Sequence, residues 1–213
     1  MPIILSPYRF AAPSLAFQTS ANSSAQTITC PTVSQYDIGV LFDAATNTAA
    51  TPPTNVIPSG FTQLQTSSLT FYRTTLSYKI FTGSESGSSL TGLDGDFSNA
   101  KLLLVFRPNS AAASVGVSTF LQETTNTDPS SQLIAASGQS APLLRLAICV
   151  DGTDAAAPSF TSGTFDATAT KTGSGNGIRA GYTIQNTSPS NDTVDTGDNG
   201  NGNCLMSGWM NFS

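Results

Sequence analysis

Two short segments of this chain are apolar almost from end to end, and they limit what it can fold into. Residues 101–107 read KLLLVFR, and residues 143–150 read LLRLAICV. Continuous apolar runs of this length, set between polar turns, are typical of strands that are buried on both faces. On an open sheet edge they would promote aggregation. We therefore expect them to lie inside a sandwich or between subunits.

The rest of the chain also has the pattern of strands. No window of about 11 residues or more has a clean apolar period of 3.6, whereas short β-type runs recur between turn-rich segments. Residues 69–81 alternate, so that Tyr72, Leu76 and Tyr78 share one face. About eight to twelve such strands indicate an all-β fold of the β-sandwich or jelly-roll-like type. The residues expected in its core are Tyr78, Ile80, Leu104, Phe106, Leu146, Ile148 and Tyr182.

The β-sandwich domain is expected to span residues 32–213. A faint internal repeat divides this domain into halves of about 32–110 and 140–213. The two halves would face each other as two sheets or stand as two similar lobes.

Two matches carry this repeat. Residues 77–80 (SYKI) resemble residues 181–184 (GYTI), 104 positions later, and residues 40–43 (VLFD) resemble residues 148–151 (ICVD). The order of the matched motifs is shared as well as the letters, which favours a true repeat. A chain this rich in Ser, Thr and Gly also produces such matches by chance.

Composition excludes several classes of function. The chain has no histidine, so it has no Ser-His-Asp or Cys-His catalysis and no imidazole metal ligand. Eight Lys and Arg residues against 13 Asp and Glu argue against a nucleic-acid partner. The longest uninterrupted apolar run, residues 102–106, is far shorter than the roughly 20 residues of a membrane span. We expect no nucleic-acid partner and no membrane span.

The cysteines do not point to a reactive site. Cys30, Cys149 and Cys204 are widely spaced and cannot all pair within one chain. Cys149 lies in an apolar run and is expected to be a small buried hydrophobe. No histidine is available to activate its thiol. The usage is that of a protein made in a reducing compartment.

The best candidate for a metal site is the loop from Asp192 to Asn203, which together with Asn191 reads NDTVDTGDNGNGN. Its carboxylates and amide carbonyls suit a hard cation such as Ca²⁺. The spacing departs from the EF-hand pattern, and Asp and Asn are also the usual residues of long turns. We favour a solvated turn, so no metal and no cofactor is expected.

Other acidic residues give weaker signals. Asp94 and Asp96 have the residue types of a glycosidase pair, but such a pair needs one carboxyl with a raised pKa in a substrate cleft. On either side of a glycine in a turn, both are expected to be solvated. Asp37 and Asp43 bracket a predicted strand and are expected to be solvated at its ends.

The aromatic residues are candidates for stacking on a sugar. They are Trp209, Tyr8, Tyr36, Tyr72, Tyr78 and Tyr182. The alternation places Tyr72 and Tyr78 on a core face, so that stacking on a sugar would fall to an exposed aromatic residue. No residue is assigned a catalytic, cofactor-binding or metal-binding role, and no enzyme activity is expected.

Several motifs in order give the chain a resemblance to known proteins. They are YDIGVLFDAAT, VIPSGFTQL, LSYKIFTG, SLTGLDGDFSNAKLLLVFRP and GNCLMSGWMNFS. This succession resembles small β-rich structural proteins of tailed bacteriophages, from about residue 35 to the C-terminus. Residues 1–31 are less typical of these proteins and are expected to form an N-terminal arm that anchors the domain to a larger assembly. The match carries no catalytic residue.

The resemblance implies a non-enzymatic virion protein, located on the particle after synthesis in the cytoplasm of the host bacterium. Its expected role is capsid decoration, head spike or fibre, or host attachment. The expected partners are other copies in a homotrimer, capsid or tail proteins, and a glycan of the host surface. The alternative is a tail-associated or stand-alone carbohydrate-binding module.

Overall fold

The computed structural model describes residues 13–47, 51–69, 71–91, 93, 98–110, 115–125, 129–151, 158–173, 176–196 and 203–212. Every helix or strand in these residues is a β-strand, and the strands pair antiparallel. The predicted all-β class is confirmed.

Two large sheets form the body of the molecule. The first has the order β1 (Leu15–Ser23), β7 (Ser98–Pro108), β3 (Ile38–Thr46), β5 (Tyr72–Ile80) and β4 (Thr62–Leu69). The second has the order β13 (Ala167–Thr172), β14 (Gly177–Gln185), β11 (Leu143–Asp151), β16 (Asn203–Phe212) and β8 (Val115–Val117), and β9 (Leu121–Thr125) also pairs with β16.

The two sheets pack face to face around one central core. Buried side chains from both contribute to it, among them Val40, Phe42, Leu104, Phe106, Leu146, Ile148, Tyr182 and Met206. The fold is therefore a β-sandwich, as the sequence predicts. A jelly-roll order of its strands stays a prediction.

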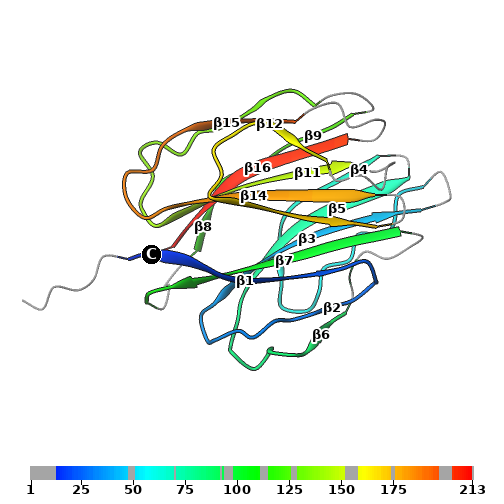
Figure 1. The fold of residues 1–213 in the computed structure, drawn as a ribbon, viewed down its shortest axis with the longest axis horizontal. Helices are drawn as coiled ribbons and strands as arrows, with labels where there is room; N and C mark the ends of the chain where they lie inside the picture. The colour runs from blue at the N-terminus through cyan, green and yellow to red at the C-terminus, as the bar shows by residue number, and fades with distance from the viewer. Residues whose placement is uncertain are drawn as a thin grey trace, which may run out of the picture.

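Each sheet is also covered on its outer face, by a smaller layer (Figure 1). The strands β2 (Ile28–Thr29) and β6 (Ser89–Leu90) cover the first sheet, where Leu103 and Val105 of β7 are fully buried. The strands β10 (Gln132–Ile134), β12 (Phe160–Ser162) and β15 (Asp192–Thr196) lie outside the second sheet. Because both faces are covered, the apolar runs in β7 and β11 are buried as predicted.

The second sheet repeats the connections of the first. In the first sheet, β3 lies between β5 and β7, which are flanked by β4 and β1. In the second sheet, β11 lies between β14 and β16, which are flanked by β13 and by β8 and β9. Even the outer pair β2–β6 has a counterpart in β10–β15. The same order of strands therefore occurs twice along the chain.

The ladders fix which residues correspond. Val40 pairs with Tyr78 on one side and Leu104 on the other. Leu146 pairs in the same way with Tyr182 and Gly208. The tyrosine match seen in the sequence agrees with this register. The other match differs from the ladders by two positions. It aligns Val40 with Ile148, whereas the ladders place Val40 in correspondence with Leu146.

The predicted core is confirmed at five of its seven positions, and Tyr78 and Ile80 are the exceptions. Ile80 is 37% exposed and Tyr78 is half-buried. Tyr78 lies opposite Thr62, the first residue of β4. Beyond that point β5 has a neighbour on one side only, so Ile80 is exposed although the alternation of the strand continues.

The two aspartates expected to be solvated are buried. The Asp37 carboxylate is fully buried and binds Arg107 through two contacts of 2.7 Å. Asp43 forms an ion pair with Lys101, which lies directly opposite on β7. The outer layer excludes water from this face of the sheet, so a carboxylate here needs a cation. The prediction of solvated strand ends is wrong for both.

The N-terminal region contributes strands to the sandwich. β1 pairs with β7 along the edge of the first sheet, and β2 pairs with β6 in the outer layer. The boundary predicted at residue 32 therefore does not coincide with an edge of the fold. Residues 1–12 lie outside the described residues.

The buried pair Asp43–Lys101 gives a test of this burial. The Lys101→Met variant removes the ammonium group that neutralises the Asp43 carboxylate, and we expect it to lower the free energy of unfolding by about 3–5 kcal/mol. The double variant Asp43→Leu/Lys101→Met removes both charges and is expected to recover most of that loss. Urea unfolding of the parent and the variants measures both. A single variant as stable as the parent would contradict burial of the pair.

Candidate functional site

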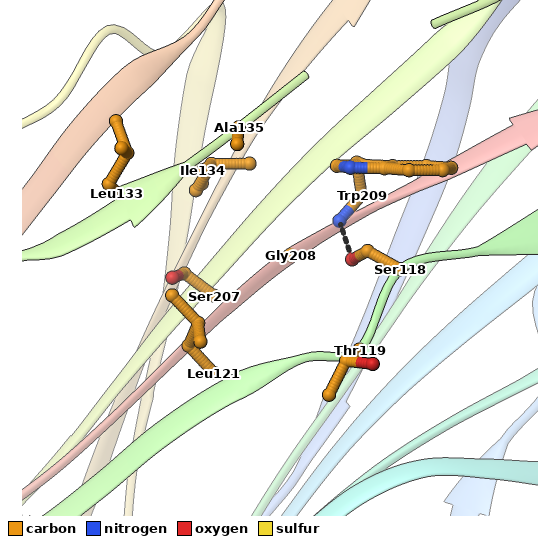
Figure 2. A pocket seen from close by; sticks show the side chains of 9 residues that line it. All are labelled: Ser118, Thr119, Leu121, Leu133, Ile134, Ala135, Ser207, Gly208 and Trp209. Atoms are coloured by element: carbon orange, nitrogen blue, oxygen red, sulfur yellow. Dashed lines mark hydrogen bonds between the residues drawn. The ribbon is translucent and has the colours of Figure 1, made fainter.

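A hollow of about 170 Å³ lies on the outer side of the second sheet, at Trp209. Its floor is the segment of β16 from Ser207 to Trp209 (Figure 2). Leu133 and Ile134 of β10 and Ala135 directly after it form one wall, and the chain from Ser118 to Leu121 forms the other. The sole tryptophan of the chain thus lines a concave site.

The wall from Ser118 to Leu121 is a β-bulge. β8 pairs with β16 up to Val117 opposite Met210, and β9 resumes pairing at Leu121 opposite Ser207. Three residues of one strand therefore face two of the other, an arrangement that re-aims side chains and is frequent next to binding sites. The Ser118 Oγ accepts a hydrogen bond of 2.9 Å from the Trp209 backbone N–H, which holds the bulge in place.

A glycine and a phenylalanine anchor this bulge. A Cβ on Gly208 would lie 2.7 Å from the ring of Phe120, so the ring packs where only glycine leaves room. Phe120 is 3% exposed and belongs to the central core. Its carbonyl accepts a hydrogen bond of 2.9 Å from the Gln65 side chain of β4. The wall is therefore tied to both sheets.

A buried glutamine ties the opposite wall to the floor. The Gln132 side chain donates to the Leu205 carbonyl at 2.9 Å and accepts from the Ser207 hydroxyl at 2.6 Å. Both contacts are buried. In a buried environment a hydrogen bond is stronger than in water, and an unpaired polar group is costly. The two walls are thus fixed before any ligand binds.

The equivalent surface of the first half is closed. Since Leu104 corresponds to Gly208, the residues Leu103 and Val105 correspond to Ser207 and Trp209. Both are fully buried under the layer of β2 and β6. The hollow therefore exists only where the second half departs from the first.

The charges near the hollow are already neutralised. Arg145 pairs with Trp209 in the ladder and is 5% exposed. Its guanidinium lies 3.1 Å from the Asp192 carboxylate, which also accepts a hydrogen bond of 2.8 Å from the Thr164 N–H. Among the lining residues in the described part of the chain, none has an ionisable side chain. The site is suited to binding rather than to acid–base chemistry.

The predicted metal loop is partly a strand. Asp192 to Thr196 form β15, in which Val194 is fully buried, so the prediction of a turn is wrong there. Asp195 accepts hydrogen bonds from the Ser131 hydroxyl and the Thr196 N–H. The described residues contain no group of three or more Cys, Asp or Glu side chains that could hold a metal ion. Residues 197–202 of the loop lie outside this description.

The other sequence candidates are scattered. Asp94 and Asp96 lie outside the described residues, as does Tyr8. Tyr72 and Tyr182 are buried in the central core, and Tyr36 is exposed in the loop before β3. The structure therefore brings together no aromatic platform from the residues that it describes, and Trp209 is the candidate that lines a hollow.

The remaining residues of the site carried no signal in the sequence. Leu121 and Leu133 are exposed apolar side chains of short strands, at 43% and 53%. Gly208 lies in a segment whose role depends on a bulge in another strand. The one available hint was the repeat itself, because Ser and Trp replace Leu and Val at equivalent positions of β7 and β16.

Comparison with known proteins gave no match, either to family models, to curated proteins or to solved structures. None of the described elements is a helix of the length and apolarity needed to cross a membrane.

The three thiols give a prediction about pH. All three cysteines are buried thiols outside any disulfide, and burial raises the pKa of Cys204 to about 11 and the pKa values of Cys30 and Cys149 as well. In the unfolded chain a thiol ionises near pH 8.5, well below the pKa of Cys204 in the folded protein. Their contribution to stability is therefore complete below about pH 8.5 and is lost as the pH rises toward the folded values.

We expect the free energy of unfolding to fall between about pH 8 and 9.5, because the unfolded chain loses thiol protons that the folded chain retains. Urea unfolding at several pH values measures the slope. The Cys204→Ala variant serves as control and is expected to show a shallower slope. An identical slope in parent and variant would mean that Cys204 is not shielded.

Proposed function

We propose that the protein is a non-enzymatic structural protein on the surface of a bacteriophage particle, in which the β-sandwich is a scaffold for assembly and attachment. The observation that carries the proposal is the character of its concave site. The hollow at Trp209 is lined by hydroxyl groups and apolar side chains and by no group that could transfer a proton. Such a site can bind a ligand but offers no group for acid–base catalysis.

The acidic residues support a scaffold role. Asp37 and Asp43 hold strands of the first sheet through Arg107 and Lys101. Asp192 ties β15 to the second sheet through Arg145. These carboxylates hold strands together, and none of them lines the hollow.

The motifs that resemble phage structural proteins support it as well. Four of them fall on β3, β5, β7 and β16, strands that form the two large sheets. Motifs in such strands belong to the scaffold of the fold. The choice of ligand depends instead on the loops and the outer layer. The particle location is inferred from this resemblance.

The surface suits association between copies. Only 10% of the chain is charged, and the exposed strands are rich in Ser and Thr. Surfaces with few charges lose little hydration when they are buried at an interface. We propose a homotrimer, which presents several copies of the same surface to a host glycan.

Two measurements test the proposal. Mass spectrometry of purified particles from a phage that carries this gene is expected to detect the protein. Light scattering of the isolated protein is expected to give about three times the 21.9 kDa of one chain. Absence from the particles would overturn the particle role, and a monomer at micromolar concentration would overturn the trimer. Cleavage of a bacterial polysaccharide that is lost in an Asp94→Asn or Asp96→Asn variant would identify an enzyme instead.

A further inference from the structure

We propose that the hollow at Trp209 is a binding site for one ring of an uncharged saccharide. A sugar ring has an apolar face of C–H groups and an edge of hydroxyl groups. The hollow offers the complement of both, with Trp209, Leu121 and Leu133 for the face and Ser118 and Thr119 for the edge. Aromatic rings that combine with a few placed polar groups are typical of small-molecule sites.

The charge of the site selects a neutral ligand. No lining residue is ionisable, and the cation next to Trp209 in the ladder, Arg145, is buried and paired with Asp192. The carboxylate of an acidic sugar would find no cation among the residues that line the hollow. Uncharged hexoses meet no such penalty.

The size of the hollow suits one ring. Its volume of about 170 Å³ lies below the roughly 300–1,000 Å³ of sites that enclose drug-sized ligands. We therefore assign it a single pyranose ring. Further rings of a chain would extend over Leu133 toward the shallow depression at Ser162, Asn191 and Thr193.

The site is built in advance, which favours binding. The bulge is anchored by Phe120 against Gly208, and Gln132 fixes β10 to the Ser207 hydroxyl. Walls held by packing and buried hydrogen bonds lose little entropy when a ligand enters. In the first half the corresponding residues, Leu103 and Val105, are buried under the outer layer. A closed surface at this position is therefore compatible with the fold, and the hollow is not required for its stability.

The sole tryptophan makes a direct test possible. Methyl glycosides of glucose, galactose and mannose are titrated into the full-length protein while the tryptophan fluorescence is recorded. At least one is expected to change the emission to saturation. A neutral polysaccharide that contains the same ring, measured in parallel, shows whether the ring is also bound within a chain.

Three variants separate binding from folding. Ala135→Phe places a ring in the hollow from an exposed position and leaves Trp209 in place, so it is expected to abolish the response. Trp209→Ala, followed by calorimetry, is expected to weaken binding at least about tenfold, which corresponds to ~1.4 kcal/mol. Tyr36→Asn is the matched control, because Tyr36 is an exposed aromatic residue remote from the hollow and its positive φ of 71° suits Asn.

The outcomes decide the proposal. Binding that survives in Ala135→Phe, or that is lost equally in Tyr36→Asn, would overturn it. So would an absence of response to all three glycosides, or binding of acidic sugars alone. The inference does not depend on the particle role, since a stand-alone protein with this hollow would give the same titration.

Discussion

The burial of both faces of two sheets is the constraint on which this structure depends. β7 and β11 have apolar side chains on both faces, and an ordinary two-layer sandwich covers one face of each sheet. In this molecule an outer layer covers the second face of each sheet. Strands β2 and β6 cover the first sheet, and strands β10, β12 and β15 cover the second. The buried pair Asp43–Lys101 follows from the same arrangement, because water is excluded from the outer face of the first sheet as well.

The outer layers also explain where a site can form. Over the first sheet, Ile28 and Leu90 join Leu103 and Val105 in a closed apolar cluster. Over the second sheet, Gln132 lies on β10 and bonds to Ser207, and a bulge interrupts the pairing of β8 and β9 with β16. The same arrangement of strands thus closes one outer surface and leaves a hollow at Trp209 in the other.

The sequence predicted what depends on local pattern and missed what depends on distant partners. The apolar runs of β7 and β11 and five of seven core residues were predictable, because alternation and run length report burial directly. Ile80 was not, because its exposure depends on where β4 begins. Asp37 and Asp43 were not, because their cations lie about 60 to 70 positions away on β7. Of the site, Trp209 was a candidate from its residue type, whereas its walls depend on a bulge and on β10.

The accessibility of Trp209 to solvent shows whether the hollow over the second half of the sandwich is open. Quenching of the tryptophan fluorescence by acrylamide in the native protein measures it. We expect efficient quenching in the parent protein and strong protection in Ala135→Phe, in which the hollow is filled. A native tryptophan that is inaccessible to acrylamide in the parent protein would show that this surface is closed, as it is in the first half, and would contradict the account.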